Sequence, residues 1–210
     1  MPASPFRRPA MLSDERAALL PGEPDPAERN DLAHTTATAL VSGGRAGADD
    51  ADLQRRLVHL VDVEGLDLLA QLWSASPAET LPGALWRLYL LREWTRRDPH
   101  TIAERYRLGC SRAEVSEVVA GVVSPPGPQE VRDLTDAVLH GVFGGDLDVA
   151  LDRAAAFLHV LVAGTALDAD WVEDADAGGA DRLTRRAGAL QSTAEDLQQA
   201  AALWRAGKLD

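Results

Sequence analysis

Apolar residues recur along much of this chain at intervals of three and four, the spacing that places them on one face of a helix. Leu53, Leu57 and Leu60 lie on one such stripe, and a second stripe begins after Gly65. No segment of useful length alternates apolar and polar residues, which is the pattern of a half-buried strand. The chain is therefore predicted to be all-α, an irregular multi-helix bundle that ends in a Leu/Ala heptad helix.

Capping residues and breakers divide this pattern into segments. Thr80 before Leu81-Pro82 and Asp98 before Pro99 are N-cap signals, and Ser42-Gly43-Gly44 is predicted to end the first helix near Val41. Residues 1–26 hold six of the twelve prolines and few large apolar groups, so a disordered tail is predicted there. The other predicted units are an N-terminal helical domain (27–123), a proline-rich linker (124–128), an antiparallel helix hairpin (129–167), an acidic loop (168–180) and the heptad helix (181–210).

The heptad helix has its own internal regularity, with intervals of four and three alternating without interruption. The positions on this seam are Leu183, Ala187, Leu190, Ala194, Leu197, Ala201 and Trp204. Because three of the seven are alanine, in alternation with larger residues, another helix can approach the seam closely. The favoured interpretation is packing against the rest of the same chain, and the alternative is dimerisation or docking on a partner.

Composition narrows the classes of function. The net charge of −12 argues against broad binding to nucleic acid or to an anionic membrane. A single cysteine, Cys110, is typical of a reducing compartment, and the longest uncharged apolar stretch, Ala154 to Leu167, is shorter than a membrane span. A cytoplasmic protein with no membrane partner is predicted. No catalytic constellation, metal-ligand spacing or cofactor motif is present, so we predict a non-enzyme without a cofactor.

One segment carries a net positive charge although the chain as a whole is acidic. Residues 87–112 contain seven arginines against three carboxylates, a net charge of +4. Residues 98–120 also have the outline of a helix-turn-helix, which would make DNA contacts of Arg96, Arg97, Arg105, Arg107 and Arg112. Glu114 and Glu117 would then face phosphates, so a pair of ordinary bundle helices with a solvated arginine face is the favoured interpretation.

Trp171 lies among the carboxylates of the predicted acidic loop. It is a candidate partner anchor, because exposed tryptophans often dominate protein interfaces. It is equally compatible with a plug that holds the loop against the core, and the sequence does not separate these two roles.

The run from Leu81 to Tyr89, with Arg92-Glu93-Trp94 and Pro125-Pro126-Gly127-Pro128, resembles a family of small all-helical proteins from high-GC actinobacteria. The resemblance covers about residues 50–165. It implies a helical fold in a bacterial cytoplasm. The family has no settled biochemical role, so no functional residue is carried over from it.

These observations favour a non-enzymatic helical protein that works in protein–protein interaction or regulation, with a protein partner or self-association. The alternative is a DNA-binding transcriptional regulator that uses residues 98–120. A more distant alternative is a helical domain that binds a small molecule or acts as an enzyme.

Overall fold

The protein is described by a computed structural model that covers residues 25–113, 119–121, 127–173 and 177–210. These residues contain nine helices and no strands, which confirms the predicted all-α multi-helix bundle. The helices are α2 (Pro26–Ala46), α3 (Ala51–Val58), α4 (Leu60–Glu64), α5 (Leu66–Trp73), α6 (Leu81–Arg97), α7 (Pro99–Cys110), α9 (Pro128–Gly144), α10 (Leu147–Glu173) and α11 (Ala177–Arg205).

The predicted tail over residues 1–26 lies outside the described residues except at its end. There Asp25 is the N-cap of α2, because its carboxylate accepts a hydrogen bond from the Ala27 N–H at 2.9 Å. Pro26 is already the first residue of the helix, a position where its missing N–H costs nothing. The tail prediction was therefore wrong for these two residues.

Helix α2 also continues beyond its predicted end near Val41, through Gly43-Gly44 to Ala46. The reason is packing against α9. A Cβ at Gly44 would lie 2.8 Å from the Phe143 Cβ, so only glycine permits this approach of the two helices. The buried Gln54 amide then donates to the carbonyls of Gly44 and Phe143, at 2.8 and 3.2 Å.

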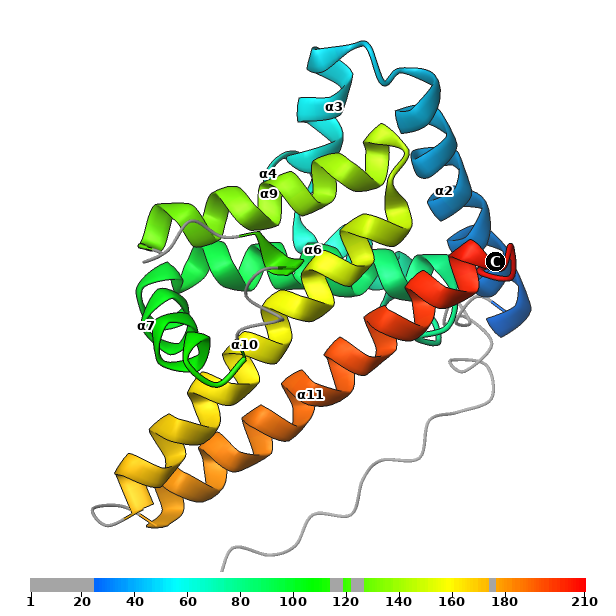
Figure 1. Ribbon diagram of the computed structural model, residues 1–210. Coiled ribbons are helices and arrows are strands. Elements are labelled where there is room, and N and C mark those ends of the chain that lie inside the picture. Colours follow the sequence, from blue (N-terminus) through cyan, green and yellow to red (C-terminus); the bar gives the residue numbers. More distant parts are fainter. Residues whose placement is uncertain (1–24, 114–118, 122–126, 174–176) are drawn as a thin grey trace, which may run out of the picture.

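The longest helices, α10 and α11, follow one another and lie side by side in opposite directions (Figure 1). Residues 168–173 belong to α10 and residues 177–180 belong to α11, so the prediction of an acidic loop over 168–180 was wrong for both parts. Residues 174–176 lie outside the described part of the chain. Aspartate and glycine made a loop the local preference, but such propensities are weak beside the packing of two long helices.

The seam of α11 packs inside the molecule. Ala194, Leu197 and Ala201 are fully buried in the hydrophobic core, and Leu190 and Trp204 pack against its edge. The neighbours of α11 are α10 and, over a shorter stretch, α6. Its small residues let α10 approach closely, as the alternation of leucine and alanine predicts.

The centre of the molecule is α6, which α2, α5, α9 and α11 surround (Figure 1). Its N-cap is Thr80, as predicted, and the Thr80 hydroxyl accepts from the Gly83 N–H at 3.3 Å. On its buried side the Tyr89 hydroxyl donates to the Leu57 carbonyl at 2.6 Å, and burial raises the pKa of this hydroxyl well above its usual value. The C-terminus returns to the same helix, where the Leu81 N–H donates to the Asp210 carbonyl at 2.6 Å.

One hydrophobic core joins the segments that the sequence separated into units. Buried residues from α2 (Ala37), α6 (Leu85), α9 (Val138) and α11 (Leu197) belong to the same cluster. The predicted N-terminal domain and the helix hairpin therefore share a core, and the linker over 124–128 does not divide two domains. Residues 124–126 lie outside the described residues, and Pro128 is already part of α9.

Helices α7 and α10 cross with their backbones in contact. A Cβ at Gly109 would lie 1.9 Å from the Val160 carbonyl oxygen, and a Cβ at Gly164 would lie 1.8 Å from the Arg105 carbonyl oxygen. Real side chains do not tolerate such separations, so glycine is required on both helices at this crossing.

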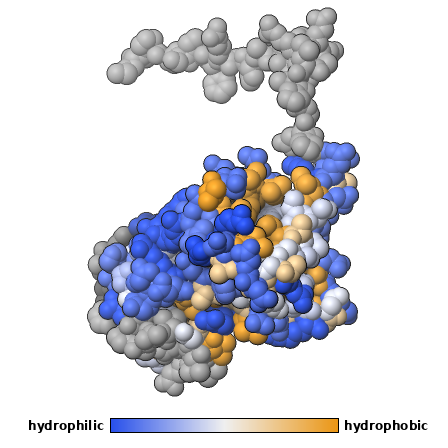
Figure 2. All heavy atoms as spheres, turned by 90° about the horizontal axis from the view of Figure 1, so that it is seen from above, coloured by the Kyte–Doolittle hydropathy of each residue, from blue (hydrophilic) through white to orange (hydrophobic). Residues whose placement is uncertain are grey.

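The described residues include one stretch, Leu147–Asp168 in α10, that is long and apolar enough to cross a membrane by length and composition. Of its most apolar window, 61% is buried against other helices, as it is in core helices that meet the same criterion. The face shown in Figure 2 is largely hydrophilic, with smaller hydrophobic patches between the polar residues.

Candidate functional site

An apolar groove of about 390 Å³ runs between α6 and α11. Its apolar lining comes from four helices: Leu66, Leu90, Leu91, Trp94, Leu158 and Leu190. Leu90 is 43% exposed, which makes it one of the few large apolar side chains left open to solvent on the described surface. The groove is the candidate site because buried apolar surface is the main source of affinity in protein association.

The groove follows from the sequence of α6. Leu90, Trp94 and Arg97 lie at intervals of four and three, so they share one face of that helix. This face turns toward α11, but α11 contacts α6 over a short stretch only. The breadth of the apolar surface of α6 was visible in the sequence, whereas the incomplete cover by α11 was not.

Charged groups are held at the edges of the groove. The Arg87 guanidinium on α6 donates to Asp196 on α11 at 3.1 Å and to the Gly83 carbonyl at 2.9 Å. At the other end the Arg97 guanidinium donates to Glu93 at 2.7 Å, and its side chain is 69% exposed. The site therefore combines an apolar floor with a fixed polar rim, an arrangement that can bind apolar side chains and orient them.

The arginines predicted to contact DNA are mostly engaged within the protein. Arg96 forms ion pairs with Asp62 and Glu93, and Arg105 lies 3.5 Å from Asp168 with its side chain 12% exposed. Arg97 is paired with Glu93, as above. The Arg107 guanidinium donates to the Ala103 carbonyl at 3.3 Å, and Arg112 is exposed.

Of the proposed helix-turn-helix, α7 supplies the first helix, with Asp98 as its N-cap. Residues 114–118, in the proposed reading helix, lie outside the described residues. The basic charge of residues 87–112 is therefore largely balanced by carboxylates from other parts of the chain, which composition alone could not show.

Arg92 is the arginine whose role sequence reasoning missed. Its side chain is 1% exposed, its Nε donates to Asp136 at 2.5 Å, and its terminal nitrogens lie 3.1 and 3.2 Å from the Asp62 carboxylate. The His59 Nδ1 lies 2.7 Å from the Arg92 guanidinium and 2.8 Å from Asp62. One ring nitrogen can accept from the arginine or donate to the carboxylate, but not both at once. We interpret this cluster as the connection that ties α3 and α4 to α6 and α9.

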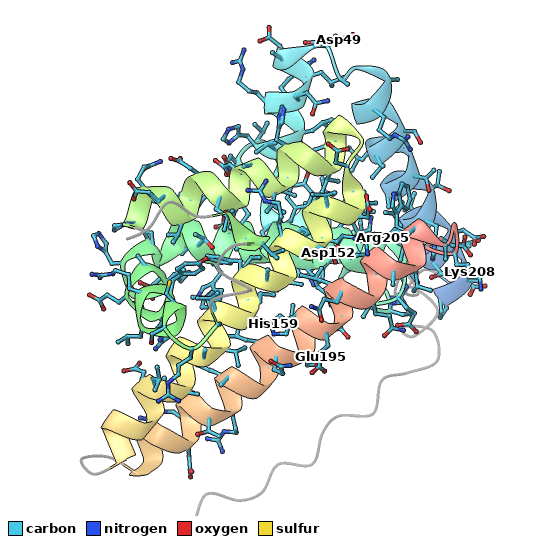
Figure 3. The ribbon with its side chains drawn as sticks, viewed as in Figure 1. Asp49, Asp152, His159, Glu195, Arg205 and Lys208 are labelled. Carbon is cyan, nitrogen blue, oxygen red and sulfur yellow. The ribbon has the colours of Figure 1, made fainter. Side chains whose placement is uncertain are left out.

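Four seam residues of α11, Ala187, Ala194, Leu197 and Ala201, are buried on the side that packs within the molecule, and Leu190 also lines the apolar groove. At the end of α11, Arg205 points toward α10, where it bonds to Asp152 and, at 2.9 Å, to Asp148 (Figure 3). The hydrogen bond that Arg205 donates to Asp152, followed by the one that it donates to Asp148, raises the pKa of the Arg205 guanidinium. Trp171 belongs to α10, but its side chain is outside the described part, so its role as a partner anchor stays a prediction.

The described residues contain no group of three His, Cys, Asp or Glu side chains placed to hold a metal ion. Comparisons with protein-family models, with curated proteins and with solved structures found no match to this chain.

Proposed function

We propose that this protein is a non-enzymatic interaction or regulatory protein of the bacterial cytoplasm that binds an amphipathic helix of a partner protein. The observation that supports this proposal is the apolar groove between α6 and α11, with Leu90 exposed on its wall and charged residues at its edges. Helices bind such grooves through apolar residues at intervals of three and four, which insert between the two walls.

The charges at the rim favour a partner helix that also carries acidic residues. Arg97 is the most exposed charged side chain at the groove, and its single hydrogen-bonded carboxylate, Glu93, is 15% exposed. A carboxylate on the partner could therefore reach the outer side of the Arg97 guanidinium, and this contact would favour one orientation of the helix. The groove would hold the central anchors, and the flanking helices would supply the rest of the contact area.

Two leucines of nearly equal exposure allow a matched test. Leu90 is 43% exposed in the groove, and Leu108 is 44% exposed on α7, outside the groove. We would select a phage-displayed library of random peptides on the full-length protein. We then compare peptide binding to Leu90→Asp and Leu108→Asp, with thermal unfolding by circular dichroism as the check on folding.

We expect the selected peptides to share apolar residues at helical spacing with acidic residues beside them. Their affinity should fall at least tenfold in Leu90→Asp and stay within about twofold in Leu108→Asp, because burying one uncompensated carboxylate costs more than 1.4 kcal/mol. Enrichment of no peptide, or equal binding to both variants, would refute the proposal.

A further inference from the structure

A second cleft, distinct from the apolar groove, opens between α3 and α9 and has a volume of about 530 Å³. Arg55 and His59 line it from the α3 side, Asp136 and His140 line it from α9, and Arg153 lines it from α10. Asp136 and Arg153 both line this cleft, because α10 turns back along α9 after the short connection between them. In a chain with a net charge of −12, this concentration of basic and imidazole groups stands out.

The one carboxylate in the lining does not neutralise these groups. Asp136 accepts a hydrogen bond from Arg92 at 2.5 Å, and Arg92 is itself buried behind the cleft. The Nε of Arg153 donates a hydrogen bond to the Ala120 carbonyl at 3.3 Å. No carboxylate of the described residues lies within ion-pair distance of the Arg153 guanidinium. Its terminal nitrogens therefore remain able to donate to a ligand. Arg55 is paired with Asp52 at the outer edge, where both side chains are largely exposed.

We propose that the α3–α9 cleft is a binding site for a small phosphate-bearing molecule. The Arg153 guanidinium supplies the charged donors, since the planar fork of arginine matches the oxygens of a phosphate group. Arg55 contributes charge and His140 contributes a ring nitrogen from the other walls, and Val58 and Ala137 provide apolar surface for the organic part of the ligand. The volume is within the range of small-molecule sites, roughly 300–1,000 Å³.

The charged and polar groups of the lining are Arg55 on α3, His59 at the C-cap of α3, Asp136 and His140 on α9, and Arg153 on α10. Behind them lie Asp62 on α4 and Arg92 on α6, which bond to each other.

The test is a calorimetric titration of the full-length protein with inorganic pyrophosphate in neutral buffer. Sodium chloride at matched ionic strength serves as the salt control, and the imidazole resonances of His59 and His140 report the site. Arg153→Gln and His140→Gln remove cleft donors. Arg107→Gln removes an exposed arginine on α7 that lies outside the cleft and donates a hydrogen bond to the Ala103 carbonyl.

We expect saturable binding that weakens roughly tenfold or more in Arg153→Gln and is unchanged in Arg107→Gln. His140→Gln should also lower the affinity, because it removes a ring nitrogen from the α9 wall of the cleft. If Arg153→Gln does not fold, pyrophosphate binding is compared between wild type, Arg153→Lys and His140→Gln, whose substituted side chain is exposed. Lack of saturation up to about 10 mM pyrophosphate, or equal losses in the Arg153 and Arg107 variants, would overturn the proposal.

Discussion

The crossing of α7 and α10 makes a strong prediction about stability, because two glycines bring the backbones into contact there. In Gly164→Ala the new Cβ would lie 1.8 Å from the Arg105 carbonyl oxygen. A carbon and an oxygen normally stay at least about 3.3 Å apart, so the helices must separate by about 1.5 Å. Both elements are packed at the density of a crystal, and a backbone atom cannot rotate away as a side chain can.

Overpacking of this kind costs about 3 kcal/mol, at the upper end of the usual range, because backbone is displaced. The higher helix propensity of alanine than of glycine offsets up to about 1 kcal/mol of this loss. The net loss of about 2 kcal/mol should lower the Tm by about 4–8 °C in a chain of this size. Gly188→Ala is the matched control, since a Cβ there meets nothing within 4 Å, and it should raise the Tm by about 2–4 °C.

Thermal and urea unfolding, followed by circular dichroism, measure both effects. The double variant Gly109→Ala/Gly164→Ala gives a sharper check, because one separation of the helices relieves both clashes. We therefore expect the double variant to lose clearly less stability than the sum of the single losses. Equal stability of Gly164→Ala and Gly188→Ala would show that α7 and α10 do not cross in this way.

Three further predictions concern single side chains. The pKa of Asp50, the N-cap of α3, is lowered by the hydrogen bond from the Leu53 N–H, so its stabilisation is present above about pH 4 and is lost as the pH falls further. The Tm difference between wild type and Asp50→Ala should therefore shrink in acid, and a constant difference would contradict the cap. Arg92→Met leaves the carboxylates of Asp62 and Asp136 without their buried partner. The free energy of unfolding in urea should fall by about 3 kcal/mol, which is the lower end of the range for a broken buried ion pair, because both carboxylates still reach water. Ala194→Leu overpacks the fully buried seam and should cost about 1–3 kcal/mol, whereas Ala202→Leu on the exposed face of α11 should be nearly neutral.

The helices were predictable where local chemistry decides. Thr80 and Asp98 cap α6 and α7 as predicted. In each case the side-chain oxygen accepts a hydrogen bond from a free backbone N–H in the first turn, and this bond does not depend on the rest of the fold. Gly65, with a φ of +86°, breaks the chain before α5 as predicted, since few other residues adopt that backbone.

Except for the cap at Asp25-Pro26, which is local, the errors have the opposite cause, because each depended on a distant segment. Gly44 continues α2 because Phe143 lies against it, and nothing in the local sequence indicates that contact. The same holds for Gly109 and Gly164, because the need for glycine at these positions depends on the crossing of α7 and α10. Of the candidate site, the apolar face of α6 was predictable, but its opening toward solvent depends on where α11 stops covering it.

The arrangement of the arginines bears most directly on the alternative of a DNA-binding regulator. A phosphate that contacted Arg96, Arg97 or Arg105 would have to compete with a carboxylate that already lies at ion-pair distance. Each such exchange gains little, and the net charge of −12 adds long-range repulsion. We therefore expect no binding of generic duplex DNA in a fluorescence titration at low salt. Salt-sensitive binding that disappears in Arg105→Glu and Arg112→Glu would instead mean that the ion pairs open on contact with DNA, and the regulator would become the better interpretation.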